Sequence, residues 1–399
     1  MFSHRLPDNL DPNEFSKLLA RKRAEGARLL DLTESNPTKA GIPYPNEEIL
    51  AALHDPRALT YEPTPRGLRS AREAVAKYYA DRGQTVHPDQ ILLTASTSEA
   101  YAYLFKLFAD PGESFLVPTP SYPLFDMLAG LEDVALVPYP LHYAESRGWR
   151  LDPDAFEGAI VPSARGVILV NPNNPTGSCL RRSEWVAVRQ AASREDLAVV
   201  CDEVFSDYLW DETLADPDVV RSIAGDDSVL SFSLSGLSKV CGLPQMKLGW
   251  IVVNGPPAGR TEVMRRLELI ADTYLSVAAP VQHAAARLLG TRGPIQVAIR
   301  ERVAFNHKRL QDLRRRCGGA DLQVLASDGG WYALLQLPGP ETDEAQTQRW
   351  LNEIDVLAHP GFFFGVEDRE VAVLSLLTPV NDFDRAMRKL GQFWTGMEC

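Results

Sequence analysis

Two hydrophobic patterns alternate through the centre of the chain. Apolar residues recur at helical spacing over residues 68–78 and 100–108, which predicts amphipathic helices. Short runs of consecutive apolar residues predict strands that are covered on both faces. These runs are Phe115–Val117, Val134–Val137, Gly166–Val170, Leu197–Val200 and Leu248–Val253. Strands that alternate with helices imply an α/β fold with a mainly parallel sheet and crossover helices.

The C-terminal part of the chain follows a different pattern. A long polar amphipathic stretch over residues 294–316 leads to strand candidates at 331–337 and 371–377, with a predicted helix at 341–353 between them. This order predicts a smaller α+β domain that residues from both termini build together. We expect an N-terminal arm and part of the small domain in residues 1–50, a large domain in 51–288 and the small C-terminal domain in 289–399.

Composition excludes several classes of protein. Of the 399 residues, 45% are apolar and 24% charged, which is ordinary for a globular protein. The net charge of −12 argues against nucleic acid and anionic membranes as partners. No segment approaches the roughly 18 consecutive apolar residues of a membrane helix, and the start of the chain lacks an apolar signal core. We therefore expect a cytoplasmic protein.

Cysteines and histidines do not predict a metal site. The five cysteines are dispersed, no pair has C-x-x-C spacing, and free thiols in a reducing compartment are the expectation. They are Cys179, Cys201, Cys241, Cys317 and Cys399. The seven histidines show no metal-ligand spacing either.

Polar residues follow the predicted strands, where open parallel sheets bind ligands. The loop 171–177, with two prolines and a terminal glycine, presents Asn174. Asp202 ends a buried strand, where a carboxylate needs either a cationic partner or a helix N-terminus to cap. Lys239 stands among small residues and is either a surface lysine or an amine tuned by burial.

Two further features precede these residues along the chain. Ser96, Thr97 and Ser98 open a predicted helix, where they either cap it or form an anion site. Tyr122 adds an aromatic ring. An anion cradle, a ring face, an amide, a carboxylate and an amine, in this order, are the parts that a pyridoxal phosphate site needs.

The chain resembles the class I/II pyridoxal-phosphate aminotransferases, with their aspartate aminotransferase-like fold, over nearly its whole length. The motifs that carry the resemblance are Tyr61-x5-Gly67-Leu-Arg, Ser96–Ala100, Pro120–Pro123, Asn173–Gly177, Asp202-Glu203 and Ser238-Lys239. The resemblance implies a three-layer large domain that binds pyridoxal 5'-phosphate. It also implies a transaminase that moves an amino group from an amino acid to a 2-oxo acid.

The resemblance also implies roles for single residues. Lys239 would hold the cofactor as a Schiff base and later shuttle a proton. Asp202 would pair with the pyridine nitrogen, Asn174 would donate to the 3-oxygen of the ring, and Tyr122 would stack on the ring. These four are the expected catalytic residues.

Further cofactor and substrate contacts follow in the same way. Ser96, Thr97 and Ser98 would hold the phosphate. Tyr61 would reach the phosphate of a neighbouring subunit, which implies a homodimer. We also expect Asn36, Asn174 and Trp331 at the substrate. Tyr332 stands beside Trp331, and for both of these aromatic residues the alternative is the small-domain core. His359, which precedes Pro-Gly, is most simply a turn residue near the mouth of the site.

Three cofactor positions depart from the family pattern. Phe205 stands where a tyrosine commonly bonds the 3-oxygen of the ring. Lys247 stands where an arginine binds the phosphate, so the charge is kept and the bidentate fork is lost. Gly236 replaces a serine, for which Ser235 is the candidate substitute.

A fourth departure concerns the substrate. The arginine that grips the substrate α-carboxylate in the family should fall near position 373, and the stretch Val371–Leu377 contains none. Candidate substitutes elsewhere are Arg66, Arg69 and Arg369. Asp272 falls near the position of a second arginine, which argues against a dicarboxylic substrate in that pocket and permits a cationic one.

Other functions remain open at this point. The same apparatus also serves elimination, cyclisation and oxidation, because the orientation of the substrate selects the bond that breaks. A non-catalytic cofactor-binding protein is less favoured, since Lys239, Asp202 and Asn174 are all retained. A Rossmann dehydrogenase is disfavoured because no G-x-G-x-x-G follows the early strands.

Overall fold

The large sheet fills the centre of the molecule. The computed structural model describes residues 2–317 and 322–395, so Cys399 lies outside the described part. In that part, eight strands form one sheet in the order β2-β9-β8-β7-β6-β3-β4-β5. The neighbours from β8 to β4 pair in parallel, and β9 and β5 pair antiparallel with their neighbours. The strands are β2 Ile91–Thr94, β3 Ser114–Thr119, β4 Ala135–Ala144, β5 Gly148–Leu151, β6 Ala164–Val170, β7 Ala198–Asp202, β8 Ser231–Gly236 and β9 Gly249–Asn254.

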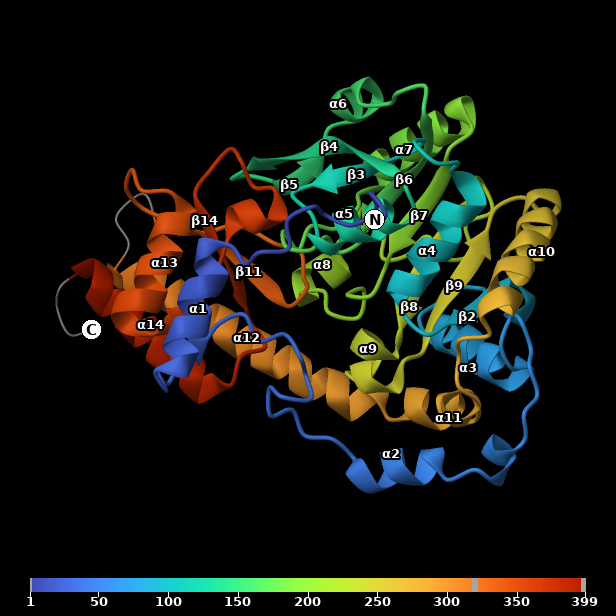
Figure 1. The fold of residues 1–399 in the computed structure, drawn as a ribbon, viewed down its shortest axis with the longest axis horizontal. Coiled ribbons are helices and arrows are strands. Elements are labelled where there is room, and N and C mark those ends of the chain that lie inside the picture. The colour runs from blue at the N-terminus through green and yellow to red at the C-terminus, as the bar shows by residue number, and fades with distance from the viewer. Residues whose placement is uncertain (1, 318–321, 396–399) are drawn as a thin grey trace.

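Helices cover both faces of this sheet (Figure 1). The side chains of β7 show why: Ala198 and Val200 pack against α4, α5 and α10, whereas Val199 and Cys201 pack toward α6 and α7. On the second face, α3 and α11 pack farther along the sheet. The large-domain helices are α2 Asn46–Leu53, α3 Arg69–Ala80, α4 Thr97–Phe108, α5 Leu124–Leu131, α6 Pro153–Gly158, α7 Arg182–Glu195, α8 Asp211–Ala215, α9 Leu237–Val240, α10 Pro257–Tyr274 and α11 Ala279–Gly290. The predicted three-layer α/β fold is confirmed.

Several strands differ from the expectation, and β5, whose four residues include Arg150, was not predicted. β8 was not predicted, because serines interrupt its apolar pattern, yet Ser231 and Ser233 are fully buried in the middle of the sheet. β4 was expected to be covered on both faces. It is largely half-buried or exposed, because it lies near the edge of the sheet with only β5 beyond it.

The second sheet belongs to the C-terminal part of the chain. Four antiparallel strands run in the order β10-β11-β14-β13, and a two-stranded parallel pair joins β1 to β12. The strands are β1 Leu30–Asp31, β10 Gln323–Val324, β11 Tyr332–Gln336, β12 Val356–Leu357, β13 His359–Pro360 and β14 Val371–Ser375. The helices here are α1 Glu14–Ala24, α12 Arg292–Cys317, α13 Asp343–Ile354 and α14 Val380–Thr395.

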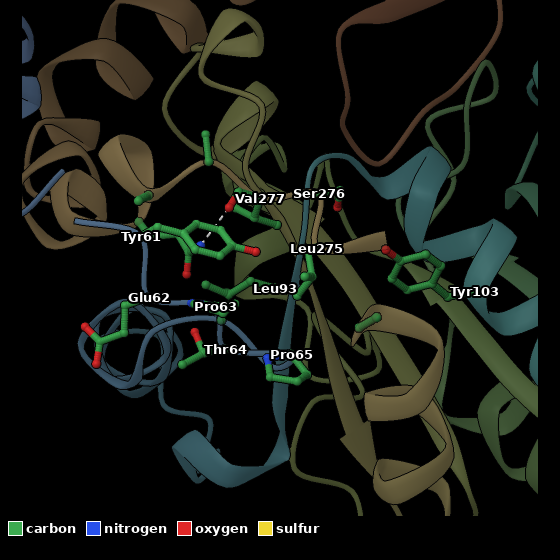
Figure 2. A pocket seen from close by; sticks show the side chains of 15 residues that line it. Tyr61, Glu62, Pro63, Thr64, Pro65, Leu93, Tyr103, Leu275, Ser276 and Val277 are labelled. Carbon is green, nitrogen blue, oxygen red and sulfur yellow. Dashed lines mark hydrogen bonds between the residues drawn. The ribbon is translucent and has the colours of Figure 1, made fainter. Parts of the chain in front are cut away.

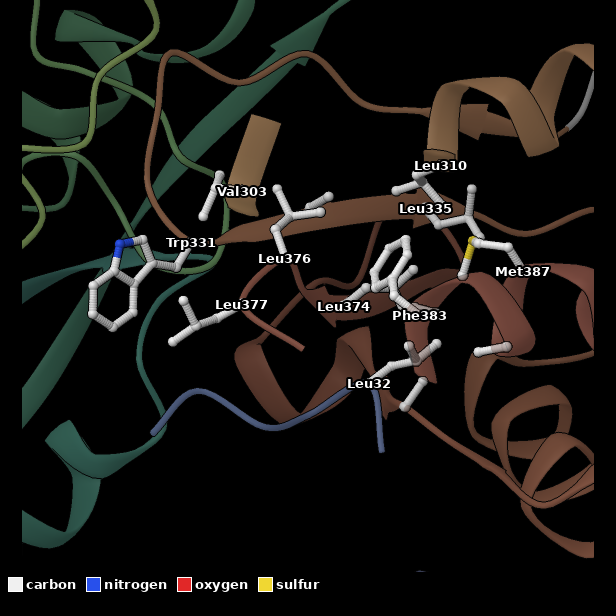
Figure 3. Close-up of a cluster of buried hydrophobic side chains, with 14 of the residues drawn as sticks. Leu32, Val303, Leu310, Trp331, Leu335, Leu374, Leu376, Leu377, Phe383 and Met387 are labelled. Atoms are coloured by element: carbon white, nitrogen blue, oxygen red, sulfur yellow. The ribbon is translucent and has the colours of Figure 1, made fainter. Parts of the chain in front are cut away.

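Residues from both ends of the chain share one apolar core. Leu32, from the N-terminal segment, packs with residues of α12, β11, β14 and α14 (Figure 3). In Figure 1, α1 accordingly lies against α13 although the two helices are far apart in sequence. The predicted small α+β domain completed by the N-terminal residues therefore has a physical basis in this core.

Strand alternation in the small sheet decides which residues face the large domain. Ala333 and Leu374 pack into the shared core, whereas Tyr332 and Val373 pack on the opposite face with Trp149 of β5. This opposite face looks toward the carboxyl ends of the large sheet. Within the described residues, no helix combines the length and apolar character that crossing a membrane requires.

Candidate active site

A cavity of about 550 Å³ lies where the carboxyl ends of β6, β7 and β8 meet the small sheet. Its size is in the range of small-molecule sites. The large domain and the small domain both contribute to its wall. The lining residues are Thr33, Ser35, Ser96, Thr97, Ser98, Tyr122, Pro123, Leu124, Phe125, Met127, Val170, Asn174, Asp202, Val204, Phe205, Gly236, Ser238, Lys239, Gly249, Tyr332, His359 and Phe364.

Asp202 is the last residue of β7 and is 8% exposed. Its carboxylate accepts hydrogen bonds from the Tyr101 hydroxyl at 3.3 Å and from the Val204 N–H at 3.1 Å. Burial raises the pKa of Asp202 to about 6, since these bonds and the charge of Lys239 offset only part of the desolvation. A cationic group placed beside this carboxylate would lower the pKa again.

Lys239 lies on α9, directly after β8. Burial lowers the pKa of its amine to about 8, and the charge of Asp202 opposes that shift. Its Nζ lies 4.7 Å from the ring centre of Trp331 and 5.3 Å from that of Phe205. The Tyr208 hydroxyl donates to the Lys239 carbonyl at 2.6 Å and fixes the backbone. Burial thus increases the fraction of the amine that is neutral and nucleophilic near neutral pH.

The N-terminus of α4 forms an anion cradle in the same cavity. Ser96 caps the helix by accepting from the Glu99 N–H at 3.2 Å, and Thr97 and Ser98 follow in the first turn. A side chain at Gly249 would place its Cβ 3.1 Å from the carbonyl carbon of Ser96, so a glycine lets β9 approach this helix end. The helix N–H groups and hydroxyls suit a phosphate.

The loop between β6 and α7 presents the predicted amide. Asn173 fixes the loop by donating to the Pro120 carbonyl at 3.0 Å and to Thr176 Oγ1 at 2.9 Å. Asn174 is 7% exposed, and its Oδ1 is buried without a hydrogen-bond partner among the residues that the structure describes. Gly177 has a φ of +68°, and an added Cβ would collide with the Gly329 carbonyl.

These lining residues fit pyridoxal phosphate. The cradle matches a phosphate, the amide of Asn174 matches a ring oxygen, and the carboxyl of Asp202, with its raised pKa, matches a protonated ring nitrogen. Lys239 places an amine within the same cavity. A half-exposed Tyr122 at the mouth offers a ring face.

Most cofactor candidates from the sequence come together at this cavity, and three do not. Those in its wall are Ser96, Thr97, Ser98, Tyr122, Asn174, Asp202, Phe205 and Lys239. Ser235 is buried within β8, and its Oγ has no partner among the described residues. Lys247 is exposed outside the lining. Ser238, next to the lysine, lines the cavity instead.

Tyr61 lies at a second hollow, with Glu62–Pro65 along one side and Leu275–Val277 along another (Figure 2). Its side chain is 80% exposed. Tyr103, which also lines this hollow, packs against Tyr274 with ring centres 5.5 Å apart and ring planes tilted by 31°.

Of the substrate candidates, Asn174 lines the cavity, whereas Asn36, Asp272 and Trp331 do not. Trp331 is fully buried in the small-domain core, because strand alternation turns Tyr332 to the cavity in its place. Asn36 uses its Oδ1 to accept from the Thr38 N–H at 3.0 Å, and neither residue lines the cavity. Asp272 is exposed on α10.

The three arginines considered as carboxylate partners are engaged elsewhere. Arg66 pairs with Glu268, and Arg69 pairs with Glu73 and Asp89. Arg369 pairs with Asp368 and lies over the ring of Tyr143. The cavity wall, as far as the structure describes it, contains none of the three.

Three wall residues from the small domain had no place among the predicted contacts. They are Thr33, Ser35 and Phe364. His359 was expected in a turn near the mouth of the site; it does line the cavity, but it lies in β13. No motif marks Thr33, Ser35 and Phe364, because their segments reach the cavity only through the pairing of β1 with β12 and of β13 with β14.

Comparison with known proteins supports the same identification. The family described as aminotransferase class I and II matches residues 27–378. The glutamate-pyruvate aminotransferase AlaA of Escherichia coli is 30% identical over 272 residues, which cover 68% of this chain and 65% of that protein. The match therefore spans slightly less than two thirds of the length of that relative. The alanine aminotransferase of Mycobacterium tuberculosis is 30% identical over 327 residues, with 80% and 70% covered.

A solved structure extends the similarity to the whole chain. An aminotransferase from Escherichia coli superposes with a TM-score of 0.84 at 25% identity, covering 100% of this chain and 99% of the other. The fold, the family match and the cavity agree with the resemblance seen in the sequence motifs. The chain belongs to the class I and II aminotransferase family, whose members depend on pyridoxal phosphate.

Proposed function

We propose that this protein is an aminotransferase that moves an amino group from an amino acid to a 2-oxo acid at the cavity around Lys239. One observation carries the proposal: a buried amine with a lowered pKa and a buried carboxyl with a raised pKa share one cavity with an anion cradle. Pyridoxal phosphate, when bound, supplies an electron sink for the carbon that bears the amine.

Residues of the chain would hold the separate parts of the cofactor. Asp202 would hold the protonated ring nitrogen. The positive charge of that nitrogen would stabilise the ionised form of Asp202, which burial alone disfavours. Asn174 would bond the ring oxygen, and Tyr122 would cover one ring face. The end of α4 would hold the phosphate.

Lys239 would hold the cofactor covalently through its Nζ. Once an incoming amine takes that place, the freed amine can take and return the proton at the α-carbon of the substrate. A lysine with its pKa lowered to about 8 suits this exchange, because it is neutral in a useful fraction of molecules near neutral pH.

The names of the relatives suggest the substrates. They are described as glutamate-pyruvate and alanine aminotransferases. We propose that this protein likewise accepts a small amino donor such as alanine and uses a 2-oxo acid as acceptor.

We also propose a homodimer in which Tyr61 reaches the site of the second subunit. The exposed apolar residues around its hollow support this arrangement, since an isolated chain would leave them in water. They are Leu59, Tyr61, Leu269, Tyr274 and Leu275. We retain the domain division 1–50, 51–288 and 289–399 and a cytoplasmic location. Cys179, Cys201 and Cys241 are buried thiols, which supports a reducing compartment.

The absorption spectrum of the purified protein with added pyridoxal phosphate tests the function. We expect a visible band of bound cofactor that an amino donor abolishes and a 2-oxo acid restores. The variant Lys239→Ala should lack the band, and borohydride should fix the cofactor to the wild-type chain only. Release of ammonia with the band unchanged would show elimination or oxidation instead. Sedimentation of the wild type and of Tyr61→Asp tests the dimer.

A further inference from the structure

The wall that faces the substrate is nearly free of positive charge. Among the described residues that line the cavity, Lys239 and His359 are the two that can carry it. Lys239 is committed to the cofactor in the proposed function. The small domain otherwise contributes hydroxyls and one phenyl ring, from Thr33, Ser35, Tyr332 and Phe364.

His359 occupies a defined place on this wall. It belongs to β13, which pairs antiparallel with β14, and the Cα of His359 lies opposite that of Val373. Paired residues of antiparallel strands project to the same face of a sheet. Val373 packs with Tyr332 and Phe364 on the face turned to the cavity. His359 thus stands directly beside the position where the sequence lacks an arginine.

The immediate surroundings of the imidazole are aromatic. The ring centres of Phe363 and Phe364 each lie 6.0 Å from that of His359. Burial lowers the pKa of His359, and the charge of Asp31 on β1 opposes that shift. Asp31 itself is held by the N–H and hydroxyl of Thr33, at 2.8 Å and 2.6 Å.

A buried carboxylate needs a charged or hydrogen-bonded partner. An amino acid whose amine reaches Lys239 must leave its α-carboxylate near the small-domain wall. A carboxylate next to an imidazole raises the pKa of that imidazole and favours the imidazolium. The other titratable groups on this part of the wall are Tyr332 and, across the cavity, Tyr122, and neither carries positive charge.

We propose that His359 is the residue that binds the α-carboxylate of the substrate, in place of an arginine on β14. This assignment rests on the proposed aminotransferase function and deepens it. It makes His359 a specificity-determining residue, which selects donors that carry a carboxylate beside the amine. Binding of such donors then weakens as the pH rises, because the imidazole loses its proton.

The test uses the cofactor-loaded protein, the variant His359→Gln and the control His142→Gln, which changes an exposed histidine on β4. Calorimetry with 2-methylalanine measures binding without turnover, since this compound has no α-hydrogen to lose. We expect His359→Gln to raise its dissociation constant at least tenfold and to remove its decrease in affinity between pH 6 and 8. His142→Gln should match the wild type.

A comparison of two donors separates a carboxylate contact from a structural role. We expect kcat/KM for L-alanine to fall at least tenfold in His359→Gln, mainly through KM, and kcat/KM for L-alaninamide to stay within twofold. Adding Val373→Arg to His359→Gln should restore binding of 2-methylalanine, because a guanidinium would then project from the paired position.

Two results would overturn the assignment. Unchanged binding of 2-methylalanine in His359→Gln would show that the carboxylate lies elsewhere, and equal losses for alanine and alaninamide would show a structural role. In both cases the wild type would still exchange amino groups, so the proposed function would stand. A wild type that binds the cofactor but reacts with no donor would overturn the function and this assignment together.

Discussion

Asp328 joins the small domain to the loop that carries Asn174. It lies in the segment between β10 and β11, and its carboxylate pairs with Arg181 at 2.6 Å and Arg150 at 3.2 Å. It also accepts from the Cys179 N–H at 2.8 Å. The backbone N–H of Asp328 donates to the Gly177 carbonyl at 2.9 Å. Removing the carboxylate in Asp328→Ala should therefore loosen the contact between the small domain and the loop that carries Asn174.

The structure sets the size of the expected loss. Breaking a buried ion pair costs about 3–5 kcal/mol when it leaves a charge unpaired. After the substitution, Arg181 would still pair with Asp216 at 2.8 Å, and the side chain of Arg150 is 24% exposed. The loss in the free energy of unfolding should therefore fall near the lower end of that range. We expect about 3 kcal/mol. With an unfolding entropy of about 2.1 cal/mol/K per residue, this corresponds to a decrease of about 4 °C in Tm for the whole chain.

Differential scanning calorimetry of the cofactor-loaded protein measures this shift. Asp368→Ala is the matched control, because Asp368 is 58% exposed and pairs only with its neighbour Arg369 among the described residues. Exposed pairs of this kind contribute at most about 1 kcal/mol, so its Tm should change by about 1 °C or less. Equal shifts in the two variants would refute the reasoning that the partly buried carboxylate of Asp328 holds the domains together.

Three further predictions concern the cavity and its supports. Phe205→Tyr should lower the pH midpoint of the visible absorption of the bound cofactor by about one to two units, since a hydrogen bond to a charged oxygen contributes about 1.5–3 kcal/mol. An unmoved titration curve would show that residue 205 does not reach the ring oxygen. Burial raises the pKa of Glu203 from 4.5 to about 7. The folded state therefore binds the proton more tightly, and urea titrations should show the free energy of unfolding falling as the pH rises from about 4.5 to about 7. In Glu203→Gln the free energy of unfolding should decrease less over this pH range. An unchanged slope would show that other groups cause the decrease. Gly177→Ala should lower the affinity for pyridoxal phosphate and destabilise the fold by more than the control Gly83→Ala, which has a similar positive φ but no atom within 4 Å of the added Cβ. The control should lose about 1–2 kcal/mol from backbone strain alone, and equal losses in thermal melts would contradict the argument.

The sequence predicted much of the large sheet because β3, β4, β6, β7 and β9 are short apolar runs, and the ligand-binding residues stand at or soon after the ends of two of them. Asp202 ends β7, and Asn174 lies in the loop after β6, so finding the strand also finds the residue. Strand β8 was not predicted, because its buried serines interrupt the apolar pattern of the sequence.

The substrate side of the site could not be predicted in the same way. Ser35 and His359 lie just after β1 and β12, two strands that pair although they are far apart in the chain, and local pattern carries no information on such pairing. Trp331 and Tyr332 are neighbours in the sequence, and only the register of β11 decides which of the two faces the cavity. Periodicity marks alternate faces of a strand without saying which face meets which domain.

The position of Trp331 beneath Lys239 has a consequence for folding in the cell. The same indole ring belongs to the core of the small domain and, although it does not line the cavity, its centre lies 4.7 Å from the Lys239 Nζ, as a floor behind the amine that would bind the cofactor. Any opening of that core removes the floor, so a chain with a loosened small domain should release its vitamin-derived cofactor before it unfolds completely. Conversely, a supply of the cofactor would favour the chains whose small domain is closed. The vitamin status of the cell would then set how much of this protein survives proteolysis as well as how much of it is active.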